Sequence, residues 1–398
     1  MKEITIAIAC EIAPGKTFIP IIRRLKELEK DGALNWSKSK IIALTHGSGV
    51  EELIKPYCDE MRPIGEGRGA GKGKINKIKL SYFIAQDIFK AIGGLSRKGV
   101  DILITCGNAG DVRKSIIAAK LLKIPIIHIE QDIYNPIETI AYSNLITVPK
   151  EKYADFLKEN YFIASEEGYI QNIHGYPMAS YVQDFIDSGN LLAKEEIMEK
   201  YNVSDFILVL LGGDLRVGDL EDLIIAIEKA DYPTLIVPYR FEKELVEKLV
   251  NSSKVKVLGG SFNLLSLMKS AKLMVYGAGM GMTIEAGVLE VPSIKIAGFH
   301  KKHGSVDLAN ELNIPIIEIN QLSDFLSDFN KVNGTVDFNN TNGTVNIDKP
   351  NGQKLLKNSQ IAIEKLIGII NNFDFKNPPK SSGFKSMKAI WNQMAKYR

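Results

Sequence analysis

The first polar residues that follow an apolar run lie in Cys10–Thr17, "CEIAPGKT", which ends like a phosphate-binding P-loop. A P-loop reads G-x-x-x-x-G-K-[ST], and Cys10 stands where its first glycine belongs. The next apolar runs end at Thr45 and Cys106 rather than at an Asp that would hold magnesium. These departures disfavour a nucleoside triphosphate site. Two interpretations stay open: a tight strand-to-helix turn, or a substrate-facing loop at a helix N-terminus, where free N–H groups attract anions.

Carboxylates follow two later apolar runs, "VDILITCG" and "IPIIHIEQD". After the first run, the small residues Asn108–Gly110 lead into a predicted helix with Asp111 in its first turn. The second run ends in Glu130, Gln131 and Asp132. Ligands bind outside the carboxyl ends of parallel strands, so these polar residues are candidates for a binding or catalytic site. The alternative for Asp111 is an ordinary acid at a helix N-terminus.

Two glycine turns follow apolar runs in the second half of the chain. In "LVLLGGDLRVGDL", Gly212 and Gly213 let the backbone approach a phosphate whose charge Arg216 can meet; an ordinary turn is the alternative. In "VYGAGMGMTIEAG", glycines between a predicted strand and a predicted helix form a phosphate-cradling arrangement, out of phase with the dinucleotide motif G-x-G-x-x-G. Glu285, one turn into that helix, suits two ribose hydroxyls better than a solvated position.

The stretch 62–79, "RPIGEGRGAGKGKINKIK", carries six basic residues against one acidic residue, a local excess of +5. A glycine-rich basic loop of this kind suits a diphosphate or anionic lipid headgroups, and a solvated loop is the alternative. It has no interleaved aromatic residues for base stacking, which disfavours nucleic acid. Its cationic residues are Arg62, Arg68, Lys72, Lys74, Lys77 and Lys79.

Alternating apolar and amphipathic stretches must position all these residues. The chain of 398 residues is 45% hydrophobic and 24% charged, with a net charge of only +3. Continuous apolar strands separated by helices indicate parallel sheets covered on both faces, and the pattern restarts at "DFILVLLGGD". We therefore expect an α/β protein with two Rossmann-like domains. The predicted domains are 1–178, 179–375 with a low-complexity loop at 330–352, and a closing helix in 376–398 that returns to the first domain.

Cysteine usage and hydropathy predict a cytoplasmic protein. The three cysteines, Cys10, Cys58 and Cys106, are too few and too scattered for a disulfide framework or a zinc site, which fits a reducing compartment. No signal peptide precedes the first predicted strand. The longest apolar runs are about 7 residues, whereas a membrane-spanning helix needs about 20. Any contact with a membrane is therefore expected at its surface, through the basic loop.

The order of these segments resembles that of GT-B glycosyltransferases. The nearest family is the one that forms lipid II, the undecaprenyl-diphospho-muramoylpentapeptide N-acetylglucosaminyltransferases. The similarity covers about residues 4–320. In chain order, the matching segments are Ala118–Asp132, Gly175–Pro177, Gly212–Arg216, the loop from Phe262, Gly277–Glu285 and His303–Leu312. The resemblance implies two Rossmann-like domains facing across a cleft. It also implies metal-independent transfer of an N-acetylhexosamine from a UDP-sugar to a lipid-linked or anionic envelope precursor.

The same resemblance implies which residues bind each substrate, with no cofactor and no metal ion. The donor UDP-sugar would be held by Gly212, Gly213, Asp214, Arg216, Phe262, Asn263, Gly277, Gly279, Met280, Gly281, Met282, Thr283, Glu285 and His303. The acceptor would be faced by Gly15, Lys16, Thr17, Asn108, Gly110, Glu130, Gln131, Asp132, Arg68 and Lys72.

The catalytic base of that family does not carry over. Its candidate is the His of a Gly-Gly-His loop, where this chain has Gly-Lys-Thr ending at Thr17. Lysine is normally protonated, so Lys16 suits phosphate binding better than proton abstraction. Glu11 and Asp111 are the candidates to replace the histidine. Asp132 stands where the family has Asn, which suggests a different acceptor.

Two other functions stay open. A UDP-N-acetylglucosamine 2-epimerase shares the two-domain fold and resembles the C-terminal part of the chain, including the acidic residue for ribose. Its dense set of acid and base residues is not recognisable in the N-terminal loops. A non-catalytic sugar-nucleotide-binding subunit is the third reading, since the family histidine is missing. Formation of UDP-ManNAc from UDP-GlcNAc alone would separate an epimerase from a transferase.

Overall fold

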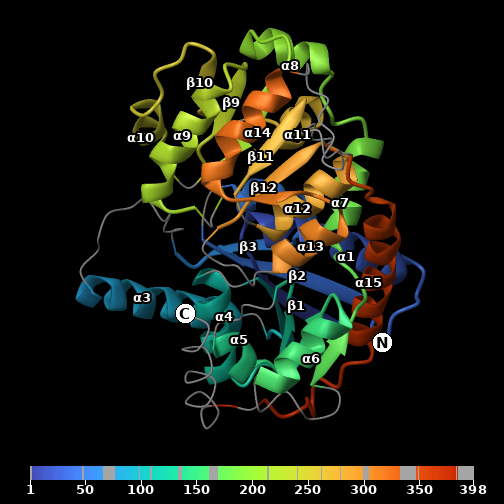
Figure 1. The fold of residues 1–398 in the computed structure, drawn as a ribbon. Helices are drawn as coiled ribbons and strands as arrows, with labels where there is room; N and C mark the ends of the chain where they lie inside the picture. Colours follow the sequence, from blue (N-terminus) through green and yellow to red (C-terminus); the bar gives the residue numbers. More distant parts are fainter. Residues whose placement is uncertain are drawn as a thin grey trace. The chain divides into compact units, whose positions relative to one another are not determined.

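The computed structural model describes residues 2–46, 49–65, 77–97, 99–107, 110–132, 137–160, 169–212, 215–239, 241–260, 262–277, 279–298, 304–331, 347, 349–381 and 383. Contacts divide the chain into two compact units, which we treat separately. Unit 1 takes in 1–68, 74–181 and 357–398, and unit 2 takes in 69–73 and 182–356. Each unit is a parallel sheet with helices on it (Figure 1). The predicted α/β fold with two Rossmann-like domains is confirmed, and the boundaries at 178 and 375 stay predictions.

Unit 1 contains a seven-stranded parallel sheet in the order β3-β2-β1-β4-β5-β6-β7. The strand order reverses between β1 and β4, which makes this place the topological switch point of the sheet. The strands are β1 (Glu3–Ala9), β2 (Lys38–Thr45), β3 (Glu60–Pro63), β4 (Ile102–Cys106), β5 (Ile126–Ile129), β6 (Leu145–Val148) and β7 (Ile170–Asn172).

Helices connect these strands and cover both faces of the sheet. They are α1 (Ile12–Lys30), α2 (Val50–Ile54), the 3-10 turn η1 (Lys55–Tyr57), α3 (Lys77–Ser96), α4 (Gly110–Leu121), α5 (Ile137–Tyr142) and α6 (Glu151–Asn160). Two further helices, α7 (Met178–Asp187) and α15 (Gln353–Asn371), each have residues in both units.

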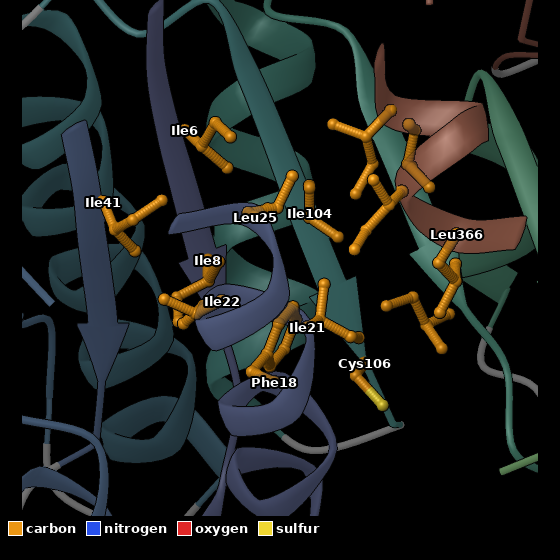
Figure 2. Packing of buried hydrophobic residues seen from close by; sticks show 14 of the residues in the cluster. Ile6, Ile8, Phe18, Ile21, Ile22, Leu25, Ile41, Ile104, Cys106 and Leu366 are labelled. Carbon is orange, nitrogen blue, oxygen red and sulfur yellow. The ribbon is translucent and has the colours of Figure 1, made fainter. Parts of the chain in front are cut away.

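Alternate residues of each strand enter two separate apolar layers, because successive side chains point to opposite faces of a sheet. On one face, Ile6, Ile8 and Ile104 pack with Phe18 of α1 and Leu366 of α15 (Figure 2). On the other face lies a second cluster that includes residues of α3 and α4. Burial of both faces explains why the strands read as continuous apolar runs.

Unit 2 contains a six-stranded parallel sheet in the order β10-β9-β8-β11-β12-β13. Its strands are β8 (Ile207–Leu210), β9 (Thr234–Val237), β10 (Val255–Val257), β11 (Leu273–Tyr276), β12 (Ser293–Ile296) and β13 (Ile316–Ile317). Its helical elements are α8 (Lys194–Tyr201), η2 (Val217–Asp219), α9 (Leu220–Lys229), α10 (Lys243–Glu247), α11 (Leu264–Ser270), α12 (Met280–Leu289), α13 (Gly304–Glu311) and α14 (Ile319–Lys331). A cluster from the strands, α9 and α14 forms one of its apolar layers.

Three short strands were not predicted from the sequence: β3, β7 and β13. They have four, three and two residues, too few for a hydrophobic pattern, and each pairs with a neighbour that the sequence does identify. The predicted closing helix in 376–398 and most of the loop 330–352 lie outside the described residues. In the described part of the chain, no helix has both the length and the apolar character that crossing a membrane requires.

Candidate functional site

The strand order of unit 1 brings three predicted polar segments to one edge of its sheet. β1, β4 and β5 are neighbours and run parallel, so their carboxyl ends lie at the same edge. Glu11 follows β1, Asp111 lies in the first turn of the helix after β4, and Glu130 and Asp132 follow β5. We call these four carboxylates the acidic edge. It lies at the switch point, where doubly wound sheets bind ligands.

Both carboxylate oxygens of Glu130 accept hydrogen bonds. Oε1 accepts from the backbone N–H groups of Gln131 and Asp132, at 3.0 and 2.9 Å. Oε2 lies 3.2 Å from Nε2 of His128, whose Nδ1 lies 2.8 Å from Oγ1 of Thr105. Glu130 is only 3% exposed. Burial raises the pKa of its carboxyl group, and the hydrogen bond from His128 opposes that rise. The carboxylate is thus desolvated and fixed in direction.

Asp111 is fully buried and has one carboxylate oxygen without a partner among the described residues. Its Oδ1 accepts a hydrogen bond from the backbone N–H of Val112 at 2.8 Å, and its Oδ2 is the unpartnered oxygen. Burial, followed by the negative charge of Glu11, raises the pKa of Asp111 to about 7, against the opposing effect of Lys114. A carboxyl group with this pKa is present in both protonation states at neutral pH, so it can give or take a proton.

A buried cation lies one turn along α4 from Asp111. Lys114 Nζ forms an ion pair with Asp87 of α3 and lies 3.2 Å from Nε2 of His46, which follows β2. Gly110 permits this arrangement, because a Cβ atom there would come 3.3 Å from Cε1 of His46. The ion pair limits the positive charge that Lys114 can offer Asp111. This is consistent with the raised pKa of that carboxyl group.

The segment that ends like a P-loop is the start of a helix. The backbone N–H of Gly15 donates to the carbonyl of Glu11 at 2.7 Å, so the segment already follows helical geometry. A Cβ atom on Gly15 would lie 3.2 Å from Ile54, which favours the interpretation as a tightly packed turn. Thr17 is buried and accepts a hydrogen bond from the side-chain amide of Gln131. Lys16 Nζ lies 6.0 Å from the centre of the Tyr181 ring.

In unit 2, small residues bring two strand ends close together. A Cβ atom on Gly277 would come 2.8 Å from Cγ of Leu215 and 3.2 Å from the backbone nitrogen of Gly212. Gly279 precedes α12 with a φ of +148°, which side-chain-bearing residues rarely adopt. We call Gly277, Gly279 and Gly281 the glycine turn. Close packing accounts for Gly277 and the φ angle accounts for Gly279, and the N–H groups at the start of α12 suit an anion.

Other predicted donor residues of unit 2 have structural partners. Asn263 caps α11, since its Oδ1 accepts from the Ser266 backbone N–H at 3.1 Å. Thr283 is buried; its hydroxyl donates to the Gly279 carbonyl at 3.1 Å and accepts from Tyr276 at the same distance. Glu285 is 2% exposed. Their roles in donor binding stay predictions.

The remaining predicted donor residues of the described part differ in exposure. Met280 and Met282 are each 6% exposed, Phe262 and Gly281 are partly buried, and Arg216 is exposed just before η2. Six predicted site residues lie outside the described residues: Arg68, Lys72, Asn108, Gly213, Asp214 and His303.

Sequence reasoning missed the second layer of polar side chains behind the acidic edge. Thr105, His128, Lys114, Asp87 and His46 were not candidates. One signal for His128 was available, because a histidine two residues before Glu130 in a strand faces the same side as that glutamate. Thr105 and Asp87 reach the site only through tertiary pairing. Among the described residues, no cluster of His, Cys, Asp and Glu has the arrangement of a metal site.

No family model and no curated protein sequence matches the chain. Solved structures do match. A UDP-GlcNAc 2-epimerase from Neisseria meningitidis bound to UDP-GlcNAc is 15% identical, with a TM-score of 0.66 over 92% of this chain and 100% of that one. The Methanocaldococcus jannaschii UDP-GlcNAc 2-epimerase in complex with UDP-GlcNAc and UDP is 18% identical, with a TM-score of 0.60 over 99% of each chain. The S. aureus MnaA–UDP co-structure is 13% identical, with a TM-score of 0.67 over 96% of this chain and 100% of that one.

These matches correct the expected function. The predicted transfer of a sugar to a lipid-linked or anionic acceptor was wrong, because several solved structures that align along 92–99% of the chain are UDP-GlcNAc 2-epimerases. The finer resemblance to the lipid II-forming family is not supported by these matches, whereas the GT-B-like fold is. The reason is physical: the glycine turns and strand ends that carried the resemblance are features of the shared GT-B-like fold. At 12–18% identity the matches show the fold alone.

Proposed function

We propose that this protein is a UDP-N-acetylglucosamine 2-epimerase-like enzyme, which inverts C2 of the sugar of a UDP-sugar. The observation that carries the proposal is the pair of buried carboxyl groups, Asp111 and Glu130, at neighbouring strand ends of the acidic edge. The fold of the chain, shared over nearly its full length with solved epimerases, supports it.

Inversion of C2 sets a specific chemical requirement. The C2–H bond must break on one face of the sugar and re-form on the other. C2 has no neighbouring carbonyl to hold the electron pair, so the pair forms a C1–C2 double bond as the UDP oxygen leaves C1, and addition of UDP to that double bond restores the C1–O bond. One group therefore takes the C2 proton, and a group on the opposite face gives one back to C2. Groups for such transfers work best with a pKa near the working pH. Asp111, with a pKa of about 7, meets that condition. Burial also raises the pKa of Glu130, whose carboxylate accepts several hydrogen bonds. This residue supplies the second carboxyl group.

The proposal assigns the nucleotide to unit 2. The glycine turn opens α12, whose N-terminal N–H groups attract the diphosphate. A Cβ atom at Gly277 would come 2.8 Å from Leu215, so this glycine lets the turn pack tightly against the neighbouring segment and fixes the start of α12. Glu285 keeps its proposed role as the ribose contact. Replacing it by Gln should then weaken UDP binding, as measured by calorimetry.

The test is incubation of the protein with UDP-GlcNAc alone, followed by separation of the nucleotide sugars. We expect UDP-ManNAc to accumulate to a constant ratio without any acceptor. Asp111→Asn and Glu130→Gln should each slow its formation about 10²-fold or more while UDP still binds. Lys194→Ala, a surface residue paired with Asp205, serves as the control. Binding of UDP with no conversion of the sugar would contradict the proposal.

A further inference from the structure

A chain of buried side chains lies behind Glu130 and has no role in the function proposed above. Thr105 on β4 and His128 on β5 are paired in the parallel register, so their side chains share one face of the sheet. The Thr105 hydroxyl oxygen lies 2.8 Å from Nδ1 of His128, and Nε2 of the same ring lies 3.2 Å from Glu130. Thr105 and His128 are 0% exposed. This row of groups is therefore shielded from bulk solvent.

With the Glu130 carboxylate ionised, as its proposed role as a proton acceptor requires, the directions of these hydrogen bonds follow. An ionised carboxylate can only accept, so Nε2 of His128 must carry the hydrogen that faces Glu130. In the neutral ring Nδ1 is then an acceptor, and the Thr105 hydroxyl must donate to it. The Thr105 hydroxyl thus fixes the tautomer of His128, and His128 fixes the orientation of the Glu130 carboxylate. Burial makes the arrangement costly to lose, since an unsatisfied polar group here has no solvent to replace its partner.

We infer that His128, oriented by Thr105, is a positioning residue that holds the Glu130 carboxylate ionised and pointed for proton transfer. This inference rests on the proposed role of Glu130 in the epimerisation. His128 donates to one carboxylate oxygen, and the backbone of Gln131 and Asp132 donates to the other. One lone pair of Oε2 is left for a substrate proton, with its direction set by the ring.

The other ionisable groups around Glu130 do not replace His128. Asp132 is negative and raises the pKa of Glu130, whereas His128 lowers it. Cys106, the neighbouring group on β4, has a thiol pKa raised by burial and by Glu130, so it stays neutral. Removing the imidazole therefore takes away the side-chain donor that lowers the pKa of Glu130, while burial and the negative charge of Asp132 still raise it. The acid limb of the rate profile should then move to higher pH.

Two variant pairs test the inference. His128→Leu removes the donor, and His128→Gln keeps an N–H near the position of Nε2. Thr105→Val removes the hydroxyl while keeping the shape, and Thr105→Ser restores it. We expect His128→Leu to lower kcat/KM about tenfold or more at pH 6, with KM little changed and the acid limb moved up by about one pH unit. His128→Gln and Thr105→Ser should recover most of the rate.

A second measurement does not depend on activity. The ¹⁵N shifts of the His128 imidazole in the full-length protein report which nitrogen carries hydrogen. We expect Nε2–H in the wild type and in Thr105→Ser, and a mixture of tautomers in Thr105→Val. An Nδ1–H tautomer in the wild type, or a His128→Leu variant with an unchanged rate profile, overturns the inference. If UDP-GlcNAc is not epimerised at all but the tautomers behave as expected, the proposed function fails and the hydrogen-bonded row stands.

Discussion

The acidic edge of unit 1 and the glycine turn of unit 2 both follow the strands of a parallel sheet. They differ in composition, since the first consists of ionisable side chains and the second of glycines. The acidic edge combines exposed Glu11 with the buried side chains of Asp111 and Glu130. The glycine turn has almost no side chains and presents backbone close to Leu215. The same architecture thus places buried carboxyl groups after the strands of one unit and a tightly packed glycine turn after the strands of the other. Under the proposed function, the first transfers protons and the second binds the nucleotide.

This difference predicts that the two regions respond differently to substitution. In the acidic edge, a substitution that keeps the shape of a side chain but removes its charge should destroy function, because the proposed chemistry depends on the ionisable groups of Asp111 and Glu130, whose pKa values burial raises. In the glycine turn, a single added methyl group should matter more than any charge.

Glu130→Gln should have the largest effect on catalysis. It keeps the size of the side chain but removes the charge that accepts three hydrogen bonds. We expect kcat/KM for UDP-GlcNAc to fall about 10²–10⁴-fold, the range typical of a lost acid–base group. Affinity for UDP, measured by calorimetry, should stay within about twofold of the wild type. A variant that keeps most of its rate would remove Glu130 from the chemistry.

Asp111→Asn should lower activity and raise stability at the same time. The folded pKa of about 7 lies above the ordinary value of 3.8. The protonated form therefore stabilises the fold below about pH 4, and this contribution is lost as the pH rises through 7. Asn cannot ionise, so the variant should be more stable than the wild type by about 2–4 kcal/mol at pH 8 and nearly equal at pH 4.

Urea unfolding at both pH values measures this difference. A gap that is the same at pH 4 and pH 8 would show that Asp111 does not titrate near neutrality. We also expect Asp111→Asn to lower turnover about 10²-fold while UDP binding is retained.

The fold and the position of the candidate site can be predicted from the sequence. The side chains that form the site can be predicted only in part. Apolar runs such as β1 and β4 mark the strands, and the carboxyl-edge rule then points to Glu11, Asp111 and Glu130. The hydrogen bond between Thr105 and His128 could not be found in this way, because it depends on the register of β4 against β5. The function was misjudged for a related reason: glycine turns encode a fold shared by enzymes of different chemistry.

Gly277→Ala tests the glycine turn. The new Cβ would lie 2.8 Å from Leu215, so a buried side chain or the backbone must shift. We expect a loss of about 1–3 kcal/mol in the free energy of unfolding and weaker UDP binding. Gly218→Ala is the matched control in the same unit, because nothing lies within 4 Å of the added atom. Equal effects of the two substitutions would mean that the close approach has no importance.

Glu11→Gln should have the smallest effect and sharpen the assignment of Asp111. Glu11 is exposed, and its negative charge is the second cause of the raised pKa of Asp111, after burial. Removing that charge should lower this pKa by a few tenths of a unit, since an exposed charge is well screened. The corresponding limb of the rate profile should move to lower pH by the same amount. A move to higher pH would contradict the proposed interaction.

The most direct test of the central claim is the fate of hydrogen at C2 of the sugar. Wild-type protein is incubated with UDP-GlcNAc in D₂O, and the nucleotide sugars are followed by ¹H NMR. The account predicts that UDP-ManNAc appears with deuterium at C2, and that Asp111→Asn and Glu130→Gln each suppress this incorporation. UDP-GlcNAc that keeps its C2 hydrogen and its configuration through prolonged incubation, while UDP binds the protein, would contradict it.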